Sequence, residues 1–126
     1  MNKDYVSYEV AKLLNKKGFD INTGTFYGNG GVFYHGSLAF HSCIRKEYGS
    51  YPAPPLHIAQ KWLRVEKDIH IMIDVCASGY YPVLWKTNGT FIKTLADKGP
   101  NDGGVWSTYE EALQTGILES LKLICQ

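Results

Sequence analysis

The chain has little of what would assign it to a specialised class of protein. Its 13 Lys and Arg against 12 Asp and Glu leave a net charge of +1, so no overall positive field draws it to long nucleic acid or a membrane. Its apolar runs are far shorter than the roughly 20 residues that cross a bilayer, and the first residues lack the apolar segment of a signal peptide. Three cysteines without a Cys-x-x-Cys pair are typical of reduced thiols in the cytosol. We therefore expect a cytoplasmic protein without a membrane or long nucleic acid as partner.

Signatures of catalysis and metal binding are also missing. The four histidines show no His-x₃-His or His-Glu-x-x-His spacing, which zinc sites on helices use. The run Gly28–Gly31 is not a phosphate loop, because Phe33 stands where the third glycine would be. No Gly-x-Ser-x-Gly motif is present, and no cysteine has a recognisable base beside it. The sequence predicts no metal, no cofactor and no enzymatic activity; the alternative is a small hydrolase that uses His41 or His70.

Tyrosine, tryptophan and glycine are abundant instead. The 126 residues contain nine Tyr, three Trp and 13 Gly, which favours aromatic β-structure with tight turns over a ligand-stacking surface. The length predicts a single globular domain over residues 1–126.

Three segments have helical spacing. The first covers residues 5–17, with Asp4 or Ser7 as N-cap and Gly18 as the residue after the helix. The second covers about 55–66 and follows a Pro-Pro pair that suits a first turn. Its expected apolar side comprises Leu56, Ile58, Ala59, Trp62, Leu63 and Val65.

The third helix begins at a capping box. Either Ser107 with Glu110 or Thr108 with Glu111 has the required spacing. Its apolar stripe consists of Leu113, Ile117, Leu121 and Ile124, supported by Ala112 and Gly116.

Strands are predicted between the helices. Residues 25–35 form a hairpin around Gly28–Gly31, and residues 69–76 place alternate apolar side chains on one face. Residues 80–86 pair with 91–95 across Asn88-Gly89, although Pro82 indicates an edge strand or a bulge. Residues 97–104 are expected to be a mobile polar loop. Residues 36–53 have no clear assignment, since 37–45 fits a short helix or a strand.

These elements predict an α+β fold. We expect an antiparallel sheet of about four to five strands packed against two or three helices. The C-terminal helix should cross one face of that sheet.

A stripe of cations on the second helix is the candidate binding site. His57, Lys61 and Arg64 are spaced i, i+4 and i+7, so they share the side opposite the apolar one. Arg45, Tyr48 and Tyr51 lie in the turn region before the helix. Arginine binds phosphate bidentately, and aromatic rings stack on bases. The plainer interpretation is a solvated helix face whose charge Glu66 and Asp68 balance.

Three segments resemble a family of small bacteriophage and prophage proteins: SYEVAKLLNKKGF, APPLHIAQKWLRVEKDIHIMI and TYEEALQTGILESLKLI. In that family a Tyr-x-Ala-Pro-Thr start precedes a Gln-Lys-Trp-Leu-Arg helix, and a Thr-Tyr-Glu-Glu-Ala-Leu helix closes the chain. Here Pro55 replaces the threonine, which removes a possible hydroxyl cap. The resemblance implies an accessory viral protein in a bacterial cytoplasm and transfers no catalytic roles.

Three functional hypotheses follow. The first is a non-enzymatic homo-oligomer that counters host defence by sequestering a nucleotide-derived signal, with Arg45, Lys61 and Arg64 as phosphate donors and Tyr48 or Tyr51 as stacking partners. The second is a protein–protein interaction module that inhibits a host factor through an aromatic surface. The third is the hydrolase named above.

Overall fold

The computed structural model describes residues 3–21, 23–35 and 51–124 of the chain. They divide into two compact units, Met1–Pro55 and Leu56–Gln126. The segment 37–45 lies outside the described residues, so its assignment as a helix or a strand stays open.

The first unit begins with helix α1 (Tyr8–Lys16). Ser7 is its N-cap, and the Ser7 hydroxyl accepts a hydrogen bond from the Val10 N–H at 3.2 Å. Gly18 follows the C-cap with a φ of 105°, a region that glycine enters without steric cost. Ser7 as N-cap and Gly18 after the helix are therefore confirmed, although the helix begins at Tyr8 and not at residue 5.

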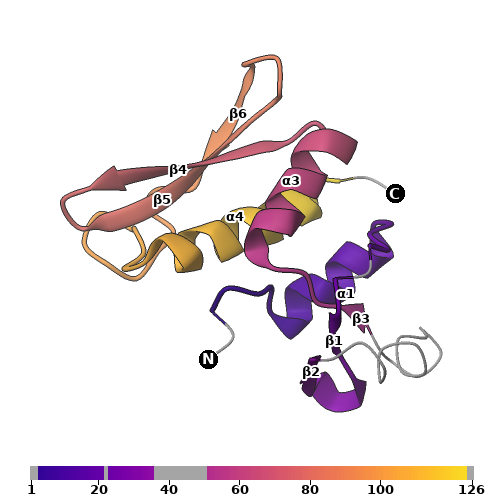
Figure 1. Ribbon diagram of the computed structural model, residues 1–126. Helices are drawn as coiled ribbons and strands as arrows, with labels where there is room; N and C mark the ends of the chain where they lie inside the picture. The colour runs from indigo at the N-terminus through magenta and orange to yellow at the C-terminus, as the bar shows by residue number, and fades with distance from the viewer. Residues whose placement is uncertain (1–2, 22, 36–50, 125–126) are drawn as a thin grey trace. The chain divides into compact units, whose positions relative to one another are not determined.

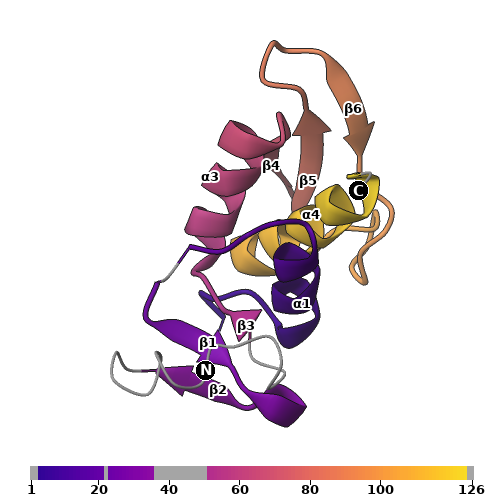
Figure 2. The same ribbon diagram turned by 90° about the vertical axis from the view of Figure 1, so that its right-hand side faces the viewer.

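A small antiparallel sheet completes the first unit. Its order is β2-β1-β3, formed by β1 (Thr25–Tyr27), β2 (Phe33–His35) and β3 (Tyr51–Pro52). A 3₁₀ turn, η1 (Asn29–Gly31), joins β1 to β2, which confirms the predicted hairpin. Helix α1 packs beside β3 (Figure 2).

Aromatic rings fill much of this unit. Phe26 is fully buried, and the Tyr27 hydroxyl donates to the Val6 carbonyl oxygen at 2.7 Å. The rings of Tyr8 and Tyr27 meet edge to face at 5.6 Å. Gly31 is required here because its φ is 85° and a side chain would come within 3.1 Å of the Tyr8 ring.

The second unit combines two helices with a longer antiparallel sheet. Helix α3 (Leu56–Glu66) precedes strands β4 (His70–Cys76), β5 (Gly79–Trp85) and β6 (Phe91–Thr94), and helix α4 (Tyr109–Leu123) follows them. The sheet order is β4-β5-β6. The predicted α+β class is confirmed, although the described strands form two three-stranded sheets and not one sheet of four or five.

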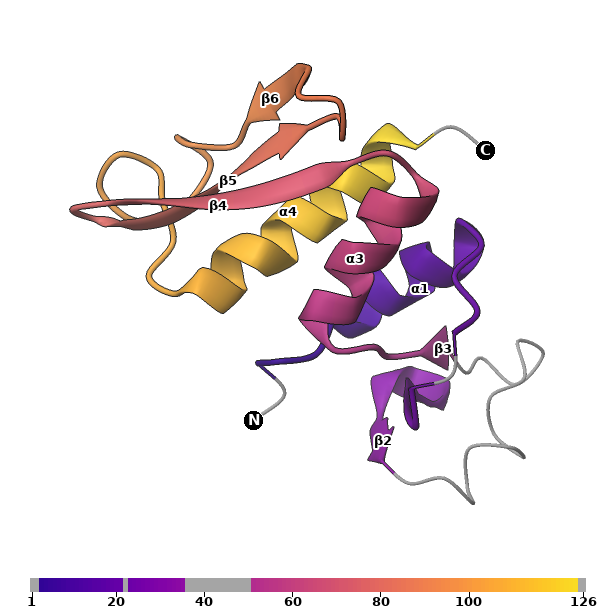
Figure 3. The same ribbon diagram turned by 45° about the horizontal axis from the view of Figure 1, so that its top comes forward.

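Helix α4 crosses one face of the β4–β6 sheet, as predicted (Figures 1 and 3). It begins at the Thr108–Glu111 capping box, in which each residue's side chain bonds the other's backbone N–H. A side chain at Gly116 would come within 2.9 Å of Ile71 and 3.0 Å of Pro82. The close approach of helix and sheet therefore depends on this glycine.

Pro82 occupies the central strand, so the expectation of an edge strand is wrong. Pro82 pairs with Ile73 of β4, and its carbonyl accepts from the Leu95 N–H at 3.0 Å on the other side. Leu95 comes after the last residue of β6. The backbone N–H that proline lacks is therefore not needed for pairing with β4 or with β6. The bulge in this sheet lies further on, between Leu84 and Trp85.

The polar loop over 97–104 contains several hydrogen bonds, and the mobility that we expected there stays a prediction. Gly99 donates to the Gly104 carbonyl at 2.7 Å, and Asn101 donates to the Val105 carbonyl at 3.0 Å. The Asn101 side chain also donates to the Ser78 carbonyl at 3.1 Å and to the Ser107 hydroxyl at 3.0 Å. Asparagine and glycine residues thus provide hydrogen bonds for the backbone N–H and carbonyl groups of the loop.

Candidate functional site

Helix α3 presents the predicted cations on one side. Its opposite side buries Leu56, Ala59, Trp62 and Leu63, which fixes the rotation of the helix. His57 and Lys61 are exposed, and Arg64 is half-buried. At 100° per residue the three side chains fall within an arc of about 60°. We call His57, Lys61 and Arg64 the cationic ridge.

No acid neutralises the cationic ridge within the part of the chain that the structure describes. The ion pairs found there join Lys86 to Asp68 at 3.7 Å and Lys122 to Glu119 at 3.3 Å. Asp68, one of the two acids expected to balance the stripe, is thus engaged elsewhere.

Asp68 has a structural role in the second unit. It has a φ of 59°, and its carboxylate accepts hydrogen bonds from the hydroxyl and the backbone N–H of Thr87, the latter at 3.0 Å. These bonds, with a smaller contribution from Lys86, hold the pKa of the Asp68 carboxyl below its usual value. Asp68 therefore ties the α3–β4 turn to the β5–β6 hairpin.

The apolar side of α3 is narrower than predicted. Val65 is 63% exposed, because it lies roughly 80° from His57 at 100° per residue, toward the solvent side of the helix. Gln60, which lies near Arg64 around the helix, donates through Nε2 to the Ile71 carbonyl at 2.9 Å. Helix α3 therefore abuts the free edge of β4.

The remaining predicted site residues are Arg45, Tyr48 and Tyr51. Arg45 and Tyr48 lie outside the described residues. Tyr51 belongs to β3 of the first unit, where it is half-buried and its ring lies 6.2 Å from that of Tyr8. Their roles as phosphate donor and stacking partners stay predictions.

The face of the β4–β6 sheet opposite α4 carries a second group of side chains, which we call the outer face. The strand register and the alternation of side chains place the following residues there: His70, Met72, Asp74, Tyr81, Val83, Trp85, Phe91 and Thr94. The rings of Trp85 and Phe91 meet at 5.4 Å with an interplanar angle of 76°. Met72 is 39% exposed and Phe91 is 53% exposed.

Sequence reasoning did not identify the outer face as a candidate site. The available signal was the alternation of Tyr81, Val83 and Trp85, opposite a Phe91 that follows an Asn-Gly turn. That pattern shows which side chains share a face. It does not show that none of the described helices covers this face.

For the hydrolase hypothesis, no hydrogen bond joins His70 to an acid or a nucleophile within the described residues. His70 is half-buried on the outer face, whereas His41 lies outside the described residues. Asp74 accepts hydrogen bonds from the Tyr81 hydroxyl at 3.1 Å and from the Val75 N–H at 2.8 Å. The bond to Asp74 raises the pKa of Tyr81, so this pair stabilises a neutral phenol.

Over residues 3–21, 23–35 and 51–124, no three His, Cys, Asp or Glu side chains come together to hold a metal ion. None of the described helices is both long enough and apolar enough to cross a membrane. Comparison with protein-family models, with curated proteins and with solved structures finds no match to this chain.

Proposed function

We propose that this chain is a non-enzymatic binding protein whose cationic ridge takes a small anionic, nucleotide-like ligand. One observation carries the proposal: His57, Lys61 and Arg64 share one side of α3, and none has an acid partner among the described residues. The packed opposite side holds the helix in place. Little ordering is then required when a phosphate binds.

Arginine and lysine suit a phosphate in different ways. Arg64 offers a planar fork that pairs two oxygens at once, and Lys61, less than one turn away, adds a compact charge. The half-buried position of Arg64 reduces solvent screening of its interaction with an anion. Arg45 of the preceding segment is a further proposed donor.

The biological context of the proposal comes from the phage-protein resemblance. In that context the ligand is a nucleotide-derived signal of host defence, which the protein removes by binding it in the bacterial cytoplasm. Effective removal needs nanomolar affinity, about −12 kcal/mol, and hence burial of most of the ligand. A chain of 126 residues achieves this most easily between subunits, so a homo-oligomer is part of the proposal.

Native mass spectrometry tests the proposal directly. The full chain is incubated with a bacterial nucleotide extract, and the retained mass identifies the ligand and the number of subunits. The variants Lys61→Gln and Arg64→Gln should each lose the retained ligand. Lys98→Gln is the matched control, because it removes an equal charge from an exposed site in the 97–104 loop. Absence of any retained ligand, or equal loss in the control, would refute the proposal.

A second candidate function is favoured by the outer face. Exposed Phe91 and Met72 could contact a host protein, as aromatic residues and methionine do in many interfaces. A pull-down from bacterial lysate with the parent chain and with Phe91→Glu distinguishes this function. The second function requires that the parent chain recovers a protein that the Phe91→Glu variant does not recover.

A further inference from the structure

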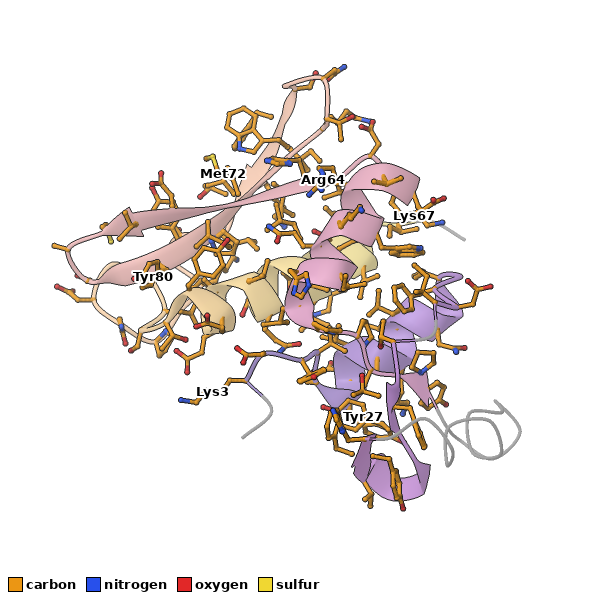
Figure 4. All side chains as sticks on the ribbon, viewed as in Figure 1. Lys3, Tyr27, Arg64, Lys67, Met72 and Tyr80 are labelled. Atoms are coloured by element: carbon orange, nitrogen blue, oxygen red, sulfur yellow. The ribbon has the colours of Figure 1, made fainter. Side chains whose placement is uncertain are left out.

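The cationic ridge and the outer face adjoin one another in the second unit. Because Gln60 bonds the Ile71 carbonyl, the side of α3 that carries Gln60 lies against the edge of β4. Arg64 follows Gln60 by one turn and therefore projects from the same side, next to the start of β4 at His70. Figure 4 shows Arg64 on α3 beside β4, with Met72 further along that strand.

Beside His70, aromatic side chains occupy neighbouring positions on β5 and β6. His70 of β4 is the register partner of Trp85 of β5, and Trp85 is the partner of Phe91 of β6. Neighbouring strands lie about 4.8 Å apart, so Phe91 is roughly 10 Å from the β4 edge. An arginine side chain and a nucleotide together can bridge that distance.

We infer that the outer face is the base-binding half of the ligand site, with the base stacked on the exposed Phe91 ring beside Trp85 and the phosphates held by Arg64 and Lys61. The inference rests on the proposed function and narrows its ligand to nucleotides. It gives Phe91 the stacking role for which the sequence suggested Tyr48 or Tyr51. Stacking on an open sheet face accepts any base, since every base has a flat π-face.

The edge of β4 does not favour an added strand as the occupant. Gln60 already bonds the Ile71 carbonyl, and the Asp74 carboxylate already accepts the Val75 N–H. A peptide or a second copy that extended the sheet would have to displace both. A nucleotide lying on the face displaces neither, and it matches the unpaired cations by charge.

Calorimetric titration of the full chain with each of the four nucleoside triphosphates and with inorganic triphosphate tests the inference. The ligands share their phosphates and differ in the base and ribose. We expect the nucleotides to bind about tenfold more tightly, the factor that one stacked base contributes. Phe91→Ala should abolish that difference and leave binding of inorganic triphosphate unchanged. Val75→Ala is the matched control, because Val75 is 63% exposed on the other face of β4.

The Trp85 indole supplies an independent readout. Its Nε1–H is buried and has no hydrogen-bond partner among the described residues. Its resonance, identified by its absence in Trp85→Phe, should shift with a nucleotide and not with inorganic triphosphate. Phe91→Leu, which keeps an apolar side chain without a ring, should behave as Phe91→Ala does.

The outcomes separate the two proposals. Equal binding of nucleotides and triphosphate, lost in Arg64→Gln, would overturn the stacking inference and leave the proposed function standing. Equal weakening of both ligands by Phe91→Ala would show a structural role for the ring and would also overturn the inference. Failure of all five ligands to bind would remove both.

Discussion

The first unit buries several aromatic rings among its aliphatic side chains, whereas the described part of the second unit buries almost only aliphatic side chains. The first has strands of three, three and two residues, and Phe19, Phe26 and Tyr27 are among its buried side chains. The second has strands of seven, seven and four residues, and Trp62 is the one ring among the buried side chains of its described part.

This difference shows how each unit uses its aromatic residues. A short sheet has few ladder hydrogen bonds, so large rings that meet edge to face supply the missing contact area. A longer sheet covered by α4 needs no rings inside. The exposed Phe91 and the half-buried Trp85 lie on the face that α4 does not cover.

Core truncations give the largest expected effects and test whether the two units are independent. Phe26→Ala should destabilise the first unit by about 3–5 kcal/mol, and Leu84→Ala should destabilise the second by about 2–5 kcal/mol, because both side chains are fully buried. Amide hydrogen exchange reads each unit separately. Phe26→Ala should speed exchange in α1 and β1, and Leu84→Ala should speed it in β4 and β5. Equal acceleration of both units by either variant would contradict the comparison.

The helix caps should give an intermediate effect that differs between the units. Thr108→Ala breaks a reciprocal capping box with bonds of 3.1 and 3.2 Å and should cost about 1 kcal/mol. Ser7→Ala removes a single bond of 3.2 Å and should cost about 0.5–1 kcal/mol. Exchange rates of the first-turn amides in α4 and α1 measure both losses. A larger loss for Ser7→Ala would reverse the expected order.

The pH dependence of stability should be the smallest effect. At acidic pH it should differ between the two units. The pKa of Asp68 is lowered in the folded state, so its stabilising contribution is present above the usual aspartate pKa, near 3.9. It is lost as the pH falls through the lower folded value. Asp68→Asn, which tolerates the same backbone conformation, should remove this acid sensitivity from the second unit only. Acid titration followed by NMR would contradict this if the β4–β5 amides of the variant kept the parent's profile.

At alkaline pH the stability of the first unit should fall as the pH rises, which is opposite to the acid response of the second unit. Burial raises the pKa of Tyr27, so its contribution is present below the usual tyrosine pKa, near 10, and is lost as the pH rises through the folded value. Tyr27→Phe should flatten that loss in α1 and β1. In the second unit the hydrogen bond to Asp74 also raises the pKa of Tyr81. Tyr81→Phe is the corresponding control variant for that unit.

Local patterns were sufficient for most helices and hairpins. The Thr108–Glu111 box and the Asn88-Gly89 turn satisfy their own backbone groups within a few residues, so their signals are complete in the sequence. The cationic ridge could also be predicted from the sequence, because residues four apart on a helix must share a side. Val65 and Pro82 were misassigned because their outcomes depend on distant partners, namely what α3 packs against and where β6 ends.

The sequence by itself determined the type and approximate bounds of most local elements, with β3 as an exception, and the grouping of His57, Lys61 and Arg64 on one side of a helix. Only the tertiary structure decided that the strands form two sheets, that Gln60 joins α3 to the edge of β4, and that Trp85 and Phe91 face outward. The physical reason is the range of the interactions. Side-chain periodicity follows from backbone geometry within one element, whereas the covering of a sheet face depends on packing between segments far apart in the chain.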